Sequence, residues 1–509
     1  MTLIAEDDIS CDDVDDLYAE SIVRSEEDEL EITRAVTNGG GLPDPTFGVN
    51  GVVTIPFAEY QFVVSPFPLT FPDFYSEYFI PLVRGTVDAQ RRSLLTITQN
   101  GMFVIVRLLD DGTLDQTFGP NANGKVFTFI PRSQEAYPVG FGDPKYAFAS
   151  SQSITLDQQG KIVVGGFVVH DNLHTSNLLV ARYDYDGNLD PFFGTNGLSE
   201  IQSDIGFSNF INQVIVDTQN RIVLVGSQNV QPAVGPIIRR FLVVRLLPDG
   251  SLDPAFANKG IFTCTVSAQS NAILRSIIVD PYGNYLIAGT AEYGKLGDVS
   301  STDLMLIKLV ENGSFDPTFG NNGIIKTKVT PKNGFYFNDI GGFKLILDAF
   351  QNVVVVGGGS DNLFGGFAKE DPIVLRYTAI QYALDNTFGV FGKSTIKSFE
   401  VANGFSSDVQ IDLFENIVGT AYDGAFPGFY GLFRLLNNGV LDTTYGANGT
   451  GLVKVPAPFG YKFRPPFIQL DASGRLYTFT LLVHIFAFPQ TASFYIARYT
   501  SDYNLLFQS

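Results

Sequence analysis

Apolar, β-branched runs recur along the chain in pairs, each pair joined by a few polar turn residues. Examples are LDQQGKIVVGG at 156–166, VDTQNRIVLVG at 216–226 and VDPYGNYLIAG at 279–289. Two such runs around a turn containing Asp, Asn or Gly are typical of a β-hairpin, whose strands we call a and b. Seven hairpins of this kind occur, and their turns begin at Asp88, Asp157, Asp217, Asp280, Asp348, Asp412 and Asp471.

Two further runs follow each hairpin. A third run ends in a basic residue and a turn, as in FLVVRLLPDG at 241–250 and LMLIKLVENG at 304–313, and predicts strand c. A short segment resembling LDPTFG, which we call the box, comes next. After it a fourth run, such as GIIKTKV at 323–329, predicts strand d. The repeating unit therefore contains four antiparallel strands, and no segment shows the apolar periodicity of a helix.

The box repeats at a nearly constant interval. Its aspartate lies at Asp44, Asp115, Asp190, Asp253, Asp316, Asp385 and Asp442, which is 398 residues in six intervals. Internal repeats of four strands predict a β-propeller, here all-β and seven-bladed, with four antiparallel strands per blade. The chain opens with a lone d-type strand at 51–57 and closes with strands a to c at about 467–500. We therefore expect the N-terminal strand to join the last blade and close the ring.

The repeated unit resembles a known family. A strand ending in RY..DG, a box LDPTFG..G and a hairpin LD..G.IVV.G together resemble the delta-60 repeat, an uncharacterised bacterial β-propeller-like family, over roughly 44–506. The sequence departs from this pattern at Ala257, which replaces the box glycine, and at Tyr445, which replaces the box phenylalanine. The resemblance implies a fold and no shared activity.

Every box carries an aromatic residue, and an identical residue in every blade suits a repeated structural role. We expect these side chains to fill the space between neighbouring blades: Phe47, Phe118, Phe193, Phe256, Phe319, Phe388 and Tyr445. We expect the following glycine to need a positive φ and the aspartate to accept local backbone N–H groups. The basic residues that end strand c could pair with the box or hairpin aspartates: Arg107, Arg182, Arg245, Lys308, Arg376, Arg434 and Arg498.

Composition divides the chain into two parts. Residues 1–40 hold thirteen Asp or Glu against two Arg, out of a net charge of −20 for the whole chain, and predict an acidic arm that is mostly disordered or forms a short helix. Residues 41–509 form the predicted propeller. An acidic chain disfavours nucleic acid as a partner, because phosphate binding needs clustered Lys and Arg.

The first residues and the longest apolar stretch of the sequence are used to predict the cellular location of the protein. The first residues, MTLIAEDDISCDDVDD, lack the basic and apolar regions of a signal peptide, which predicts a cytoplasmic protein. Export by another route, or incorporation into a particle, stays open. The longest apolar stretch, 476–488, is shorter than the roughly 18 residues that a membrane span needs, so no membrane insertion is expected.

Catalytic and metal-binding motifs are sparse. The three histidines, His170, His174 and His484, show no metal-ligand spacing on a helix, and no nucleotide-binding or nucleophile motif is present. The segment DYDGNLD at 184–190 alternates oxygen donors like a calcium loop, but the equivalent segments in other repeats lack those donors. We therefore predict no catalytic residue, metal or cofactor from these motifs.

Sequence variation concentrates in the b–c and d–a connections, which we expect to share one face of the disc, while the a–b and c–d turns share the other. These long connections are rich in Phe and Tyr, which mark contact surfaces. The candidate binding residues are Phe335, Tyr336, Phe337, Phe426, Phe429, Tyr430, Tyr461 and Phe463. They favour a non-enzymatic interaction or structural module that binds a protein partner or a larger assembly. Two alternatives remain: a lactonase- or esterase-like hydrolase with a metal held by axial carboxylates, and a glycan-binding lectin.

Overall fold

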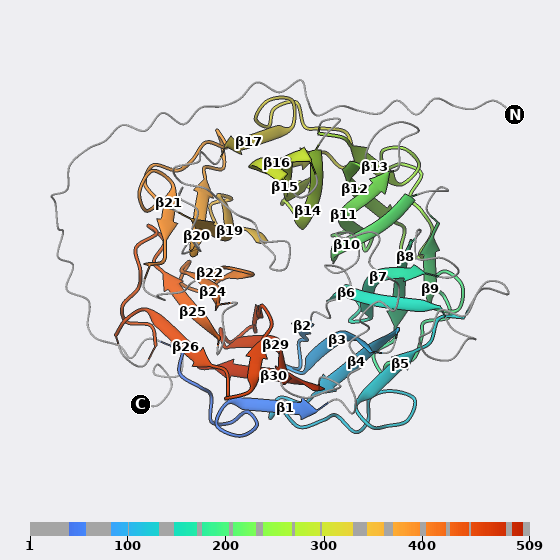
Figure 1. Ribbon diagram of the computed structural model, residues 1–509. Helices are drawn as coiled ribbons and strands as arrows, with labels where there is room; N and C mark the ends of the chain where they lie inside the picture. The colour runs from blue at the N-terminus through green and yellow to red at the C-terminus, as the bar shows by residue number, and fades with distance from the viewer. Residues whose placement is uncertain are drawn as a thin grey trace, which may run out of the picture.

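A computed structural model of the protein describes residues 40–56, 83–99, 101–131, 147–169, 176–202, 207–230, 238–266, 270–295, 298–328, 344–360, 370–397, 404–423, 428–446, 449–484 and 491–501. These residues form 30 β-strands and no α-helix, so none of the described segments is a helix able to cross a membrane. The predicted acidic arm lies outside the described residues. The strands form seven blades arranged in a ring (Figure 1), which confirms the predicted seven-bladed β-propeller. Blades 3 and 4 are joined into one eight-stranded sheet by a single residue pair, Arg239 with Asn271.

The first four blades follow chain order from the inner to the outer strand. Blade 1 contains β2 (Arg84–Val87), β3 (Ser93–Gln99), β4 (Met102–Leu108) and β5 (Lys125–Thr128). Blade 2 contains β6 (Phe148–Leu156), β7 (Ile162–Val169), β8 (Asn177–Tyr183) and β9 (Leu198–Ile201). Blade 3 contains β10 (Phe207–Val216), β11 (Ile222–Val230), β12 (Ile238–Leu246) and β13 (Ile261–Cys264). Blade 4 contains β14 (Ser270–Val279), β15 (Tyr285–Lys295), β16 (Asp298–Leu309) and β17 (Ile324–Lys328).

The last three blades include two in which the inner strand is interrupted. Blade 5 contains β18 (Lys344–Leu347), β19 (Val353–Ser360), β20 (Glu370–Tyr377) and β21 (Lys393–Thr395). Blade 6 contains β22 (Gly404–Phe405) and β23 (Val409–Ile411), followed by β24 (Ile417–Asp423), β25 (Phe429–Leu435) and β26 (Leu452–Pro456). Blade 7 contains β27 (Tyr461–Phe463) and β28 (Phe467–Leu470), followed by β29 (Leu476–His484), β30 (Thr491–Tyr499) and β1 (Val52–Pro56).

The N-terminal strand closes the ring as predicted. Strand β1 pairs antiparallel with β30 over five residue pairs, from Val52 with Ala497 to Pro56 with Ser493. The contact extends beyond the strand, because the backbone N–H of Asp44 donates to the carbonyl of Arg498 at 2.9 Å. The two ends of the chain therefore share one sheet, and blade 7 has no free outer edge on β30.

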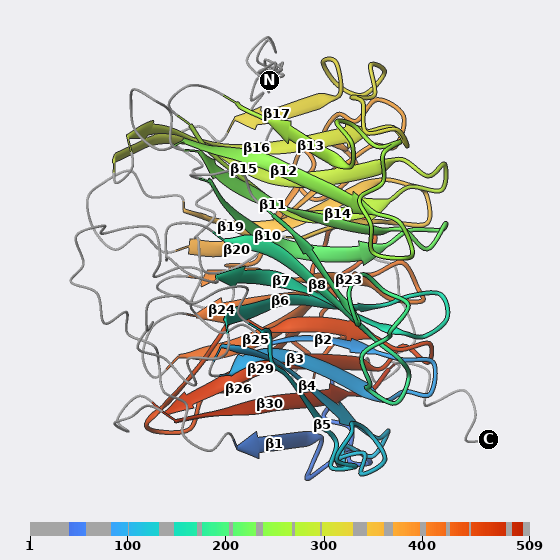
Figure 2. The ribbon, with the colours of Figure 1, turned by 90° about the vertical axis from the view of Figure 1, so that its right-hand side faces the viewer.

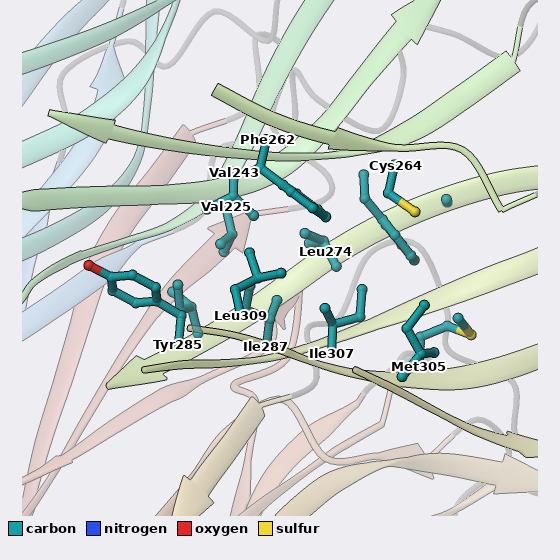
Figure 3. Close-up of a cluster of buried hydrophobic side chains, with 14 of the residues drawn as sticks. Val225, Val243, Phe262, Cys264, Leu274, Tyr285, Ile287, Met305, Ile307 and Leu309 are labelled. Atoms are coloured by element: carbon teal, nitrogen blue, oxygen red, sulfur yellow. The ribbon is translucent and has the colours of Figure 1, made fainter. Parts of the chain in front are cut away.

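The hydrophobic core lies between blades. In the joint between blades 3 and 4, Val225 and Val243 of one sheet face Leu274, Ile287 and Ile307 of the next (Figure 3). A blade is covered on both faces by its neighbours, so its central strands are apolar on both sides. Every residue of β7, for example, is buried. For this reason the sequences of the middle strands are continuous apolar runs and do not alternate between apolar and polar residues.

The predicted a–b and c–d turns lie together at one face of the disc (Figure 2, right). Asp110 of a c–d turn forms ion pairs with two a–b turn residues, Arg91 at 2.9 Å and Arg475 of blade 7 at 3.1 Å. We call this the turn face. The long b–c and d–a connections fall largely outside the described residues.

Candidate functional site

The basic residue that ends each c strand forms an ion pair with the aspartate of the box. In blade 2, Arg182 Nε donates to Asp190 Oδ2 at 2.8 Å, while Asp190 Oδ1 accepts the backbone N–H of Phe192 at 3.1 Å. The predicted pairing is confirmed in all seven blades: Arg107–Asp115, Arg182–Asp190, Arg245–Asp253, Lys308–Asp316, Arg376–Asp385, Arg434–Asp442 and Arg498–Asp44. Both partners are buried in every pair.

These contacts keep the box carboxylates charged. Burial by itself would raise the pKa of Asp442, but hydrogen bonds from Thr444 and the positive charge of Arg434 outweigh it and lower the pKa. Hydrogen bonds and neighbouring cations lower the pKa against burial in the same way for Asp44, Asp115, Asp190, Asp316 and Asp385. These groups are therefore ionised acceptors at neutral pH with no proton to donate.

The box aromatic lies between its own blade and the next. Six of the seven are fully buried and Tyr445 is 4% exposed. The guanidinium of Arg107 lies 4.3 Å from the ring centre of Phe118 on one side. On the other side is Gly187 in the c–d turn of blade 2, where an added Cβ would lie 2.7 Å from that ring. Only glycine leaves room for such close contact, so the ring and the neighbouring turn fit each other.

Backbone hydrogen bonds add to this joint. The residue after the box aromatic donates its N–H at 2.7 Å to a turn carbonyl of the following blade: Gly48 to Asp111, Gly119 to Asp186, Gly194 to Asp249, Ala257 to Asn312, and Gly389 to Asn438. The same residues have a positive φ, as predicted. Ala257 adopts a φ of 44° without being glycine. The polar groups of the box are thus engaged in contacts within and between blades.

A second ring of repeated positions lies on the innermost strands, which surround the centre of the disc (Figure 1). It consists of the residue four places before each hairpin aspartate: Arg84, Ser153, Gln213, Ser276, Lys344, Asp408 and Phe467. At four joints this side chain accepts a backbone N–H of the next blade. The bonds are Val214 N to Ser153 Oγ at 3.1 Å, Ile277 N to Gln213 Oε1 at 3.0 Å, Leu345 N to Ser276 Oγ at 3.2 Å, and Ile468 N to Asp408 Oδ2 at 2.9 Å.

The ring changes character in blades 5, 6, 7 and 1, where charged and aromatic residues replace the neutral acceptors. Lys344 Nζ lies 3.1 Å from Asp408 Oδ1, and that oxygen also accepts the N–H of Val409 at 2.8 Å. The guanidinium of Arg84 lies 3.2 Å from the ring centre of Phe467. Lys344 has no acceptor for the N–H of Val409, so Asp408 bonds this group itself.

A further cation comes from the opposite side of the ring. Strands β6, β10 and β14 each contain a register shift, which leaves Gln152, Asn212 and Arg275 as extra residues. Burial lowers the pKa of Arg84 to about 9, the charge of Asp408 opposes this, and the positive charge of Arg275 lowers it further. Arg275 belongs to blade 4 and Arg84 to blade 1, so the charge of Arg275 acts on Arg84 across the ring. We call Arg84, Arg275, Lys344 and Asp408 the axial cluster.

The sequence could have identified this cluster, because aligning the repeats on the hairpin aspartate places three of its four residues at one offset. Arg275 stands at the neighbouring offset, displaced by the bulge. β-Bulges often lie next to functional sites, where they redirect a side chain.

The predicted loop aromatics fall into three groups. Phe429, Tyr430 and Phe463 are buried, and Tyr430 Oη lies 2.8 Å from Tyr499 Oη, so these three belong to the core of blades 6 and 7. Tyr461 is half-buried and its ring lies 4.6 Å from that of His484. The other candidates, Phe335, Tyr336, Phe337 and Phe426, lie outside the described residues.

A metal centre built from axial carboxylates has few residues to form it. Among the described residues, no three His, Cys, Asp or Glu side chains come together as metal ligands. At the axis, both oxygens of Asp408 are already bonded to Lys344 or to backbone N–H groups. In this part of the chain, the ligand set that a metal-dependent hydrolase needs is not assembled.

Comparison with known proteins supports the fold. Residues 160–193 and 220–256 are similar to a family described as a domain of unknown function (DUF5122) beta-propeller. No curated protein matches the sequence.

Similar solved structures are distant. A protein of unknown function from Dyadobacter fermentans is 11% identical with a TM-score of 0.41, covering 73% of this chain and 97% of its own. Virginiamycin B lyase from Staphylococcus aureus is 8% identical with a TM-score of 0.38, covering 87% and 98%. The polysaccharide lyase Uly1 is 10% identical with a TM-score of 0.41, covering 81% and 89%. At these values the likenesses carry no argument about activity.

Proposed function

We propose that the chain is a non-enzymatic binding module, a propeller disc that holds its aromatic b–c and d–a connections toward a protein partner or a larger assembly. The observation behind this proposal is the contrast between the two sets of connections. The a–b and c–d turns are nearly identical, and their polar groups are bonded within and between blades. The other connections are long, differ between repeats and are rich in Phe and Tyr. Variable segments on a rigid scaffold are where binding residues usually lie.

The box residues support a non-catalytic role. Their carboxylates are ionised, buried and paired, and their arginines are held by the same pairs. A general acid needs a proton near neutral pH and access to a substrate, which these groups lack. The role of the repeated ion pairs is therefore to hold the blades together.

The proposal is tested by capturing partner proteins from an extract of the source cells and quantifying them by mass spectrometry. We expect the triple variant Phe335→Ala, Tyr336→Ala, Phe337→Ala to lose capture while keeping its melting temperature. The matched control replaces three exposed turn-face aromatics, Phe192→Ala, Tyr282→Ala and Phe350→Ala, and should retain capture.

Two outcomes would contradict the proposal. One is capture that survives in the loop variant but disappears in the turn-face variant. The other is capture that free oligosaccharides compete away while the loop variant binds normally, which would favour the lectin alternative. A stoichiometric divalent metal in the purified protein would favour the hydrolase alternative instead.

A further inference from the structure

The axial cluster is positive in an otherwise acidic protein. Lys344 is paired with Asp408, the backbone N–H next to Phe467 donates to the same carboxylate, and Arg84 lies over the ring of Phe467, whereas the whole chain carries a net charge of −20. The charge of Arg275 acts on Arg84 from the other side of the ring. The cations come from separate blades: Arg84 from blade 1, Arg275 from blade 4 and Lys344 from blade 5. Converging like charges repel each other, so such a cluster is costly unless an anion joins it.

The carboxylate of the cluster does not supply that anion for Arg84. Asp408 Oδ1 is bonded to Lys344 Nζ at 3.1 Å and to its own neighbour's N–H, and Oδ2 accepts the N–H of Ile468 at 2.9 Å. Asp408 reaches Arg84 only through its charge and forms no ion pair with it among the described residues. Its hydrogen-bonding capacity is directed at blades 5, 6 and 7.

Arg84 is placed to bind a ligand. Its guanidinium lies over the ring of Phe467 at 3.2 Å from the ring centre, which fixes the plane of the group and leaves its edges for hydrogen bonds. Its Nη1 is buried and has no hydrogen-bond partner among the described residues. A buried, charged donor without an acceptor is energetically unfavourable, and an oxyanion would satisfy it.

Solvent has access to this region. The Lys344 side chain is 27% exposed, and Arg84 and Arg275 are half-buried. A small ion can therefore approach the cluster beside Lys344, and it reaches the buried Nη1 of Arg84 when neighbouring side chains move. Partial desolvation of the cations strengthens their interaction with an anion.

We propose that the axis of the disc is an oxyanion-binding site, in which Nη1 of Arg84 donates to a phosphate-type dianion and Arg275 and Lys344 contribute positive charge. Three cations against the single carboxylate of Asp408 match a ligand of two negative charges better than a single carboxylate group. The site would accept free phosphate or the phosphate group of a larger ligand. It is independent of the proposed partner-binding loops, since it uses other residues.

The test is calorimetric titration of the full chain with inorganic phosphate in chloride buffer at constant ionic strength. We expect wild type to bind with a dissociation constant of about 1 mM or tighter. Arg84→Gln should weaken binding about 10- to 100-fold, the usual effect of losing a hydrogen bond between charged groups. Arg84→Lys keeps the positive charge but lacks the planar guanidinium group, so its affinity for phosphate should lie between those of wild type and Arg84→Gln. The control Lys259→Gln removes an exposed positive charge in the blade 3 box and should bind as wild type does.

Parallel titrations with sulfate and acetate define the ligand class, and melting curves in chloride show whether each variant is folded. Sulfate binding that also depends on Arg84 would support a dianion site. The proposal is overturned if wild type shows no phosphate binding, if acetate binds as tightly as phosphate, or if a folded Arg84→Gln binds phosphate like wild type. If Arg84→Gln does not fold, Arg84→Lys is the deciding variant. A phosphate affinity equal to that of wild type in Arg84→Lys would contradict the proposed hydrogen bond from the guanidinium of Arg84.

Discussion

Five of the arginines that end c strands, Arg107, Arg182, Arg245, Arg376 and Arg498, each contact two blades at once. Arg376 pairs through Nε with Asp385 of its own box at 2.8 Å, covers the ring of Phe388 at 4.7 Å, and donates through Nη1 to the carbonyl of Asn437 in the next blade. Lysine has no planar fork to make these contacts together. In blade 4, where Lys308 replaces arginine, Nζ instead lies 3.2 Å from Asp316 and 3.2 Å from the hydroxyl of Tyr382.

The sequence predicted the pairing within a box because the residues recur at a fixed spacing. It did not predict the stacking of Arg376 on Phe388 or the bond to Asn437. These contacts depend on how one blade lies against the next, which local spacing does not encode.

Ala257 provides a test of backbone strain at a single residue. Its φ of 44° is costly for a residue with a Cβ, and glycine occupies this position in the other six boxes. We expect Ala257→Gly to raise the free energy of unfolding by about 0.5–1 kcal/mol, the relief of strain exceeding the extra chain entropy of glycine. Urea denaturation measures the change. The reverse substitution, Gly194→Ala, should destabilise, because its Cβ would lie 2.1 Å from the carbonyl oxygen of Leu198. Two variants of equal stability would contradict the strain argument.

At the level of secondary-structure elements, most of the strands could be predicted from the sequence. Paired apolar runs with Asp-containing turns identified the hairpins, and the leftover strand at 51–57 identified the closure of the ring. The shifts in register on β6, β10 and β14 were not predicted, because an extra residue within an apolar run does not disturb its composition. The breaks between β22 and β23 and between β27 and β28 were not predicted either, although Ser406, Ser407 and Asp408 fall in the first and Pro465 and Pro466 in the second.

The contribution of strand β1 to stability can be tested by truncating the chain. Removing residues 1–39 leaves β1 and its box in place, so the melting temperature should not change. Removing residues 1–56 deletes β1 and the ion pair between Asp44 and Arg498, exposing the edge of β30. We expect this longer truncation to melt at a markedly lower temperature and to aggregate through the open edge. Scanning calorimetry compares the two proteins, and equal melting temperatures would show that β1 does not hold the ring closed.

For the whole molecule, closure of the ring creates contacts that no single repeat contains. Arg84 and Asp408 stand far apart in the sequence, and the charge of Asp408 acts on Arg84 only because seven blades surround one axis. The repeat pattern predicted the number of blades and hence the ring. It did not show which side chains meet across the ring's centre, because the acceptors at equivalent positions in blades 2, 3 and 4 are neutral and bond their neighbours instead.

Thermal unfolding of Phe319→Ala measures how much the repeated box contributes to joining the blades. Phe319 is fully buried in a cluster with Leu345 and Tyr377 of blade 5. The control, Phe192→Ala, removes a box phenylalanine that is 82% exposed. We expect Phe319→Ala to lose about 3–5 kcal/mol of stability and to melt several degrees lower, while Phe192→Ala melts as wild type and both folded variants bind phosphate normally. A Phe319→Ala protein that melts like wild type, or that stays folded but loses binding, would contradict this expectation.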